Sequence, residues 1–328
     1  MSDIEIRRKG RAGRITLARP AALNALTYDM ALGIEAALEA WSGDDDVALV
    51  VIDAEGDKAF CAGGDLGAMY ESATQGDFEY GRRFWRDEYR LNAKIARYPK
   101  PFVALMQGFV MGGGVGISCH GSHRVVCETT RIAMPECAVG LVPDVGGSWL
   151  LARAPGRLGE YLGMTGARMG PAEAIEAGFA DHFIPREAWA ELVAELVETG
   201  EVEPVIRRAI PAGESRFTAA AARISEVFAL RTAADIEAAL DGDELGDAVA
   251  GLRRGCPLSV ACTLELVRQV RRLDGIEAAL AMEYRFTARS AEQGDFIEGI
   301  RAAIIDKDRR PAWRHKSLAD VSAAEVAA

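Results

Sequence analysis

The chain carries Phe60-Cys61-Ala62-Gly63-Gly64-Asp65 and, further along, Gly108-Phe109-Val110-Met111-Gly112-Gly113-Gly114-Val115-Gly116. Each of these glycine-rich stretches follows an apolar run that is typical of a buried strand. Glycine allows the backbone to approach a ligand closely. Where such a turn opens a helix, unpaired N–H groups point outward and can hold an anion or a developing oxyanion. Each turn could therefore supply one such N–H group.

The same glycines could also serve only tight strand-to-helix turns, which is the usual explanation for an isolated glycine pair. Here both turns share the pattern, and this weakens that explanation. Neither turn is a nucleotide fingerprint, because no G-x-G-x-x-G register fits around Gly112 and no G-x-x-x-x-G-K-[ST] occurs. No G-x-S-x-G elbow occurs either, so a serine hydrolase of the α/β-hydrolase type is unsupported.

Outward from these turns, strand and helix patterns alternate, which predicts an α/β fold with several crossovers. The expected elements are a hairpin of residues 4–6 and 14–17, helices at 28–41 and 78–97, and strands at 47–52, 102–106, 124–127 and 179–184. From about Arg186 onward the pattern is almost wholly helical, as in 188–197 and 258–273. A polar zone near 241–247 indicates a surface loop, and we expect two parts, residues 1–185 and 186–328.

Composition limits the functional classes. With 328 residues, 49% of them hydrophobic, the chain can bury a large core. A net charge of -11 argues against a broad surface for nucleic acid or anionic membrane. No apolar run reaches the roughly 20 residues that cross a bilayer, and no signal core is present, so we expect a cytoplasmic protein. The six cysteines form no C-x-x-C pair and are expected to be reduced.

Catalysis, if present, is expected to rest on carboxylates. Glu136 and Asp144 lie in an apolar stretch punctuated by Gly and Pro, where burial would raise their pKa values toward the range useful for acid/base chemistry. Each could instead cap a helix or bond a loop backbone. Glu88 lies in an amphipathic helical pattern, whose ordinary explanation is a solvated face. The four histidines, His120, His123, His182 and His315, do not indicate a metal site.

Three stretches, Ala21-Ala22-Leu23-Asn24-Ala25-Leu26, residues 58–66 and Gly112 to Gly114, resemble the crotonase, or enoyl-CoA hydratase/isomerase, superfamily. The resemblance implies the ClpP/crotonase-like fold, a spiral of β-β-α turns with two roughly perpendicular sheets and a C-terminal helical region that closes the site. It implies an oxyanion hole for a thioester carbonyl, made by the N–H groups of Gly64 and Gly113. Coenzyme A (CoA) would lie across Lys58, Ala59, Ala62, Gly63, Gly64, Asp65 and Leu66.

Within the superfamily, an enoyl-CoA hydratase has a catalytic Glu where this chain has Gly116, whereas the second hydratase Glu matches Glu136. The segment from Val139 to Gly147, with Asp144, resembles the hydroxyisobutyryl-CoA hydrolases instead. Residues 111–121, 84–92 and 295–313 support that narrower match. It gives Glu88 a substrate-contacting role.

The resemblance implies hydrolysis of a small hydroxyacyl-CoA, such as 3-hydroxyisobutyryl-CoA in valine breakdown. Glu136 would activate water or attack as a nucleophile, and Asp144 would position the substrate hydroxyl or assist proton transfer. No cofactor is expected beyond CoA, which is part of the substrate, and a homo-oligomer is possible. The alternatives are an isomerase or hydratase with the same oxyanion hole, and a non-catalytic CoA-binding protein.

Overall fold

The computed structural model describes residues 3–240 and 245–327. The chain forms two compact units. Both sheets lie in the first, the sheet unit, which comprises residues 1–64, 87–133 and 169–215. The second, the helical unit, comprises residues 65–86, 134–168 and 216–328, and its described residues form no strand. The expected division at residue 185 stays a prediction; that position lies inside the last segment of the sheet unit.

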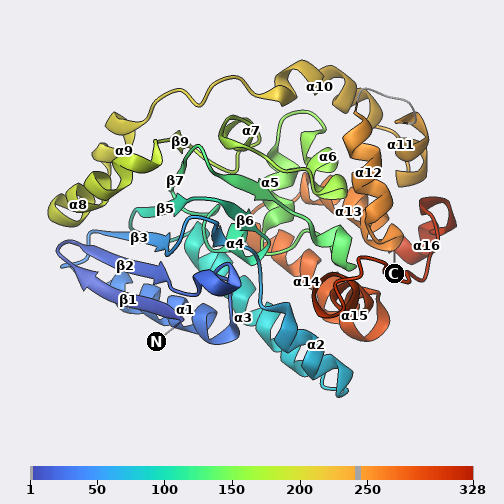
Figure 1. Ribbon diagram of the computed structural model, residues 1–328, viewed down its shortest axis with the longest axis horizontal. Helices are drawn as coiled ribbons and strands as arrows, with labels where there is room; N and C mark the ends of the chain where they lie inside the picture. Colours follow the sequence, from blue (N-terminus) through green and yellow to red (C-terminus); the bar gives the residue numbers. More distant parts are fainter. Residues whose placement is uncertain (1–2, 241–244, 328) are drawn as a thin grey trace. The chain divides into compact units, whose positions relative to one another are not determined.

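The larger sheet has six strands. They are β1 (Ile4–Lys9), β2 (Ala12–Leu17), β3 (Leu49–Ala54), β5 (Phe102–Met106), β7 (His123–Val126) and β9 (His182–Phe183), in the order β1-β2-β3-β5-β7-β9. The first two form the expected antiparallel hairpin, with Lys9 opposite Ala12. Every later pair is parallel, which requires the helical crossovers that the alternating pattern predicts. Figure 1 shows the strands following one another from the blue hairpin to β9.

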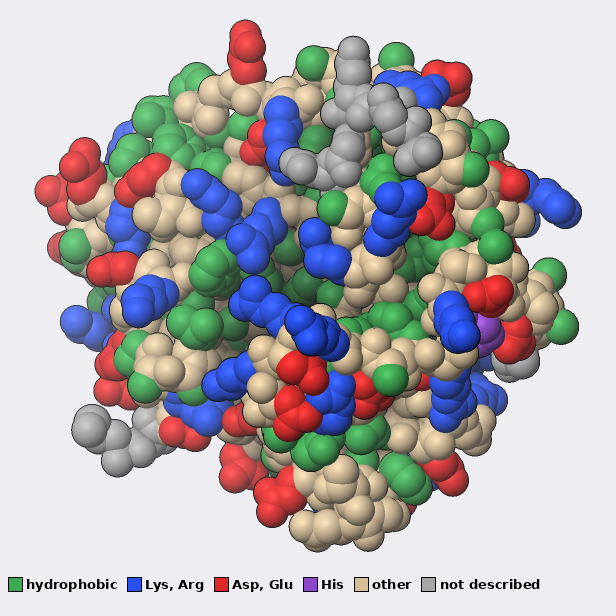
Figure 2. All heavy atoms as spheres, turned by 45° about the vertical axis from the view of Figure 1, so that its right-hand side comes forward, with side chains coloured by type: hydrophobic (Ala, Val, Ile, Leu, Met, Phe, Trp, Pro, Cys, Tyr) green, Lys and Arg blue, Asp and Glu red, His purple; other side chains and the backbone are tan. Residues whose placement is uncertain are grey.

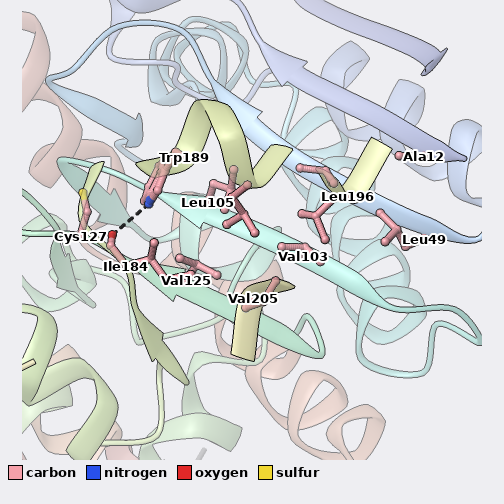
Figure 3. Packing of buried hydrophobic residues seen from close by; sticks show 12 residues of the cluster. Ala12, Leu49, Val103, Leu105, Val125, Cys127, Ile184, Trp189, Leu196 and Val205 are labelled. Atoms are coloured by element: carbon pink, nitrogen blue, oxygen red, sulfur yellow. Dashed lines mark hydrogen bonds between the residues drawn. The ribbon is translucent and has the colours of Figure 1, made fainter. Parts of the chain in front are cut away.

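Helices cover both faces of this sheet. On one face, Trp41 of α1 (Tyr28–Ser42) lies so close to β2 that a Cβ atom on Gly13 would stand 2.4 Å from its ring. On the other face, Trp189, Leu192 and Leu196 of α8 (Trp189–Thr199) join a buried apolar cluster with residues of β2, β3, β5 and β7. Figure 3 shows these side chains and the hydrogen bond from Trp189 Nε1 to the Ile184 carbonyl, 3.0 Å long.

The smaller sheet has three short parallel strands. They are β4 (Ala59–Cys61), β6 (Phe109–Met111) and β8 (Arg131–Ala133), in the order β4-β6-β8. Because parallel strands end at the same edge, the turns after β4 and β6 are neighbours. The remaining elements of the sheet unit are η1 (Pro20–Ala22), the second part of α3 (Glu79–Ala96), α4 (Gly113–Gly116), α7 (Pro171–Glu176), η3 (Arg186–Ala188) and α9 (Glu203–Arg208).

In the helical unit, α5 (Gly147–Arg153), α6 (Leu158–Thr165) and α13 (Pro257–Val270) pack on one another. Glu160 of α6 is fully buried, and Arg157 and Arg271 each pair with one of its carboxylate oxygens, at 2.8 and 2.6 Å. The other elements are α2 (Leu66–Thr74), the start of α3, η2 (Glu136–Val139), α10 (Arg216–Val227), α11 (Ala233–Ala239), α12 (Gly246–Arg254), α14 (Ile276–Gln293), α15 (Phe296–Ile300), a π-helical turn η4 (Arg301–Ile305), η5 (Leu318–Asp320) and α16 (Ala323–Ala327).

Three expectations differ from the structure. The strand expected at 47–52 is observed two residues later, as β3. The strand expected at 179–184 shrinks to β9, because the N–H groups of Phe179 and Ala180 both bond to the Ala174 carbonyl and close the turn after α7. Of the loop expected near 241–247, residues 241–244 lie outside the described residues, and α12 already begins at Gly246.

On the face of the molecule drawn in Figure 2, Lys and Arg side chains gather in the middle of the view, and Asp and Glu side chains lie mostly below the middle and toward the rim. Within residues 3–240 and 245–327, no helix combines the length and the apolar character that crossing a bilayer requires.

Replacing Trp189 tests the cluster beneath α8. We expect Trp189→Ala to lower the free energy of unfolding by about 3–5 kcal/mol, because a fully packed aromatic side chain leaves a cavity. Trp189→Phe should cost less, since it keeps most of the ring contact and loses chiefly the hydrogen bond to Ile184. Urea unfolding followed by circular dichroism measures both. A loss below 1 kcal/mol for Trp189→Ala would contradict this packing.

Candidate active site

Asn24 joins the N-terminal motif to the strand that carries the first glycine turn. Its side-chain oxygen accepts from the Arg19 N–H at 2.9 Å, and its amide nitrogen donates to the carbonyls of Glu55 and Ala59, both at 2.9 Å. The residue is buried and has a left-handed φ of 54°, a conformation that asparagine tolerates better than most residues. Asn24 therefore fixes the start of β4, and with it the turn that follows.

The two glycine turns pack on each other with almost no space between them. Cys61 ends β4, and a Cβ atom on Gly114 would stand only 2.3 Å from the Cys61 carbonyl oxygen. Gly63 has a φ of 116° and Gly112 has a φ of 49°, so both need the conformational freedom of glycine. The Leu26 N–H donates to the Gly63 carbonyl at 2.8 Å, which anchors the first turn from its other side.

The structure brings Gly64, Gly113 and Glu88 together. A Cβ atom on Gly113 would stand 3.3 Å from the Gly64 nitrogen and 2.9 Å from Glu88 Oε1. The first residue of α4, Gly113, thus lies beside the Gly64 N–H. The geometry places two main-chain nitrogens and one carboxylate around a small volume, as an oxyanion hole with a nearby acid requires.

Glu88 is not a solvated helix residue, as its amphipathic surroundings suggested. It is 3% exposed and lies on α3 in the sheet unit. Its charge adds to the effect of burial on the nearby Cys61 thiol, whose pKa rises to about 12. Cys61 is therefore a neutral thiol at physiological pH, which makes it a poor nucleophile.

In the expected CoA-binding segment, exposure changes along the chain. Lys58 is exposed, Ala59 is buried in β4, and Ala62 and Gly64 are half-buried in the turn. Asp65 and Leu66 begin α2 and belong to the helical unit. Contact of these residues with CoA stays a prediction.

Glu136 and Asp144 lie in the helical unit and are both buried, with 6% and 4% of their surfaces exposed. Burial raises the pKa of Glu136 well above its ordinary value, and the charge of Asp144 raises it further. Glu136 Oε2 has no hydrogen-bond partner among the residues that the structure describes. A carboxyl with a raised pKa and an unused oxygen is suited to hold or move a proton.

The segment that carries Glu136 is tied to α13. The Cys256 N–H donates to the Cys137 carbonyl at 2.7 Å, and the Cys137 thiol lies 3.2 Å from the Thr263 hydroxyl. Gly140 ends η2 with a left-handed φ of 77°, where a Cβ atom would stand 2.7 Å from the Asp295 carbonyl oxygen. These contacts fix the backbone of Glu136 in the helical unit.

A third acid, Glu283 of α14, is not among the site residues predicted from the sequence. It is fully buried, and it contributes to the raised pKa of Glu136 through its charge. Its position carries a signal, because it lies at helical spacing on the buried face of α14 with Ile276, Ala279, Leu280, Thr287 and Ser290. An acid on an otherwise buried helix face is unusual and could have been found from the sequence.

The histidines do not lie together at one site. His123 and His182 stack with ring centroids 6.3 Å apart in the sheet unit, and His315 Nε2 lies 3.0 Å from Glu325 Oε1 in the helical unit. Among the described residues, no group of three His, Cys, Asp or Glu side chains is placed to hold a metal ion. The six cysteines are free thiols, as expected.

Comparison with known proteins identifies the family to which the chain is similar. The family model for enoyl-CoA hydratase/isomerase matches residues 12–328. The chain is 35% identical to 3-hydroxyisobutyryl-CoA hydrolase 1 of Arabidopsis thaliana, over 98% of this chain and 89% of the relative. It is 36% identical to the mitochondrial 3-hydroxyisobutyryl-CoA hydrolase of Gallus gallus, over 98% and 86%.

Two crystal structures are also similar. One, described as an enoyl-CoA hydratase from Rhodobacter sphaeroides, is 55% identical with a TM-score of 0.94, over 99% of this chain and 96% of that one. The other, described as a carnitinyl-CoA dehydratase from Mycobacterium thermoresistibile, is 41% identical with a TM-score of 0.95, over 100% and 96%. The expected crotonase fold is therefore confirmed.

Gly113→Ala tests the small volume between the turns. The added methyl leaves both N–H groups in place, but it would stand beside the Gly64 nitrogen and Glu88 Oε1 and obstruct the space where the thioester oxygen would lie. We therefore expect turnover of an acyl-CoA substrate to fall by about 10²–10³, as much as the loss of one oxyanion donor costs. Gly43→Ala is the matched control, since a Cβ atom there meets nothing within 4 Å. Steady-state kinetics and circular dichroism of both variants give the answer. Full activity of Gly113→Ala would exclude an oxyanion hole here.

Proposed function

Because this chain belongs to the enoyl-CoA hydratase/isomerase, or crotonase, family, we propose that it hydrolyses the thioester of a short hydroxyacyl-CoA. The favoured substrate is 3-hydroxyisobutyryl-CoA, which would give 3-hydroxyisobutyrate and CoA, a step of valine breakdown. The relatives that bear the name of this hydrolase align over nearly the whole chain. A cytoplasmic location and a homo-oligomer stay predictions.

The observation that carries the proposal is the glycine at position 116. A hydratase adds water with a pair of glutamates, and here the first of these positions is the buried last residue of α4, with no carboxylate. Glu136 alone remains of the pair. A single acid that acts together with an oxyanion hole suits thioester hydrolysis, in which one group activates water or attacks the carbonyl itself.

In the proposed reaction, the N–H groups of Gly64 and Gly113 stabilise the negative charge that develops on the thioester oxygen. Glu136 acts either as general base, taking a proton from water, or as nucleophile, forming an anhydride that water then cleaves. Asp144 holds the substrate hydroxyl or assists proton transfer, and Glu88 helps to hold the acyl group or a water network. CoA leaves as the free thiol, so the reaction requires no cofactor.

The names of the two similar crystal structures favour a second candidate, hydration or isomerisation of an unsaturated acyl-CoA. That reaction would use the same oxyanion hole to stabilise an enolate, with Glu136 and Asp144 moving protons. It releases no CoA thiol, which separates it from hydrolysis. A non-catalytic CoA-binding protein would bind the ester tightly and turn over neither kind of substrate.

Release of free thiol tests the hydrolase directly. We expect the purified chain to release CoA thiol from 3-hydroxyisobutyryl-CoA, and Glu136→Gln to lose this activity because an amide cannot accept the proton or attack the carbonyl. A thiol reagent follows the reaction, with 3-hydroxypropionyl-CoA and crotonyl-CoA measured alongside. A spectral change on crotonyl-CoA without thiol release would support the second candidate, and undiminished turnover by Glu136→Gln would remove its assigned role.

The pH profile tests the coupling of the two acids. Burial and the charge of Asp144 raise the pKa of Glu136, so activity that needs ionised Glu136 is lost as the pH falls through that raised value. Asp144→Asn removes one charge, lowers the pKa of Glu136 and shifts the acid limb of the remaining activity to lower pH. The measurement is kcat/KM against pH for both proteins. An acid limb at the same pH in both would contradict the coupling.

A further inference from the structure

Glu283 reaches from α14 to the N-terminus of α5. Its Oε2 accepts from the Gly146 N–H at 2.9 Å, and its Oε1 accepts from the Ser148 N–H at 3.1 Å and from the Ser148 hydroxyl. The cap residue of α5, Gly146, has no side chain to do this. A carboxylate from another helix therefore satisfies the first N–H groups of α5, which otherwise lack partners.

The segment held in this way follows directly on Asp144. Val145 has a φ of 53° and Gly146 a φ of 76°. A β-branched residue in the left-handed region is strained, and such a conformation persists only where surrounding contacts enforce it. The Gly147 N–H also donates to the Asp144 carbonyl at 2.6 Å, which closes the turn. The bonds to Glu283 come from the residues that directly follow Val145, and they help to hold it in this conformation.

We propose that Glu283 is a positioning residue: by capping α5 it holds the strained Val145 turn, and thereby orients Asp144 toward the hydroxyl of the substrate. This inference rests on the proposed function, which gives Asp144 that hydroxyl. It assigns Glu283 no contact with substrate.

The charge and hydrogen bonds of Glu283 also indicate that it does more than fill space in the core. Burial raises the pKa of Glu283 to about 8, and the three hydrogen bonds from Gly146 and Ser148 oppose the rise. The charge of Asp144 adds to the rise, and Glu283 in turn raises the pKa of Glu136. Three buried acids thus interact in the helical unit. An apolar side chain would fill the same space without this repulsion, but it would leave the turn uncapped.

The test compares two substrates that differ only in the hydroxyl, 3-hydroxyisobutyryl-CoA and isobutyryl-CoA. For wild type, Asp144→Asn, Glu283→Gln and the double variant, kcat/KM is measured on both esters. We expect Glu283→Gln to lower kcat/KM for the hydroxy ester by about 10–100-fold, the size of effect that misplacing a reacting group by about 1 Å produces. The unsubstituted ester should be much less affected.

The double variant separates positioning from general damage. If Glu283 acts through Asp144, the double variant loses no more than Asp144→Asn alone. If Glu283→Gln lowers kcat/KM for both esters equally, or if the two losses multiply, the inference is wrong. Glu292→Gln is the matched control: it makes the same change on the same helix at an exposed glutamate, and it should leave both values unchanged.

Two further results keep the test decisive. If Glu283→Gln does not fold, Ser148→Ala replaces it, because it removes only one of the three donors to Glu283. A smaller loss with the same preference for the hydroxy ester supports the inference, and an equal loss on both esters overturns it. Failure of the proposed function itself is distinct, since the wild-type protein would then release no thiol from either ester.

Discussion

The parallel pairing of β4 with β6 is the constraint on which the candidate site depends. It places two strand ends at one edge, and the contact between Gly114 and the Cys61 carbonyl leaves no room for a side chain there. Asn24 fixes the start of β4 through three hydrogen bonds. Two of them go to carbonyls that a buried backbone would otherwise leave unpaired. The position of Gly64 beside Gly113 follows from this pairing.

The acids of the helical unit are governed by burial and by one another's charges. Glu136, Asp144 and Glu283 are all buried; the charge of Asp144 raises the pKa values of Glu136 and Glu283, and the charge of Glu283 also raises that of Glu136. Such a group of acids is costly in a folded protein unless hydrogen bonds compensate it. At Glu283 three donors provide that compensation, whereas Glu136 keeps one oxygen without a partner among the described residues. Glu136 is therefore suited to proton transfer, whereas Glu283 is suited to hold the backbone of Gly146 and Ser148 in place.

Much of this could be predicted from the sequence, and the remainder had physical reasons to be hidden. Long periodic segments such as α1, α3 and β5 were placed within two residues, because their apolar spacing is regular. The short strand β9 was overestimated, since the apolar residues before it belong to a turn. The pattern around Glu88 was misleading because amphipathic spacing marks which face is apolar, and does not show that an acid is enclosed.

Some of the site residues could likewise be predicted from the sequence, and the role of another could not. The two glycine turns, Glu136 and Asp144 stood out because glycine runs and acids in apolar surroundings are unusual in a sequence. The resemblance to the crotonase family then singled out Gly64 and Gly113 within the turns. Glu283 lies at a position that its buried helix face marks, but its role was hidden, because its partners Gly146 and Ser148 are more than a hundred residues away and only the fold brings them to α14.

The proposed oxyanion donors are main-chain atoms, and this affects how the chain can change during evolution. A substitution replaces a side chain and leaves the amide in place, so no single exchange other than one to proline deletes the Gly64 or Gly113 N–H. The carboxyls, by contrast, can be gained or lost by one codon change each, as Gly116 and Glu136 illustrate. New reactions can therefore arise on this scaffold by exchanging acids, while the backbone that carries the two proposed donors is inherited with the sheet.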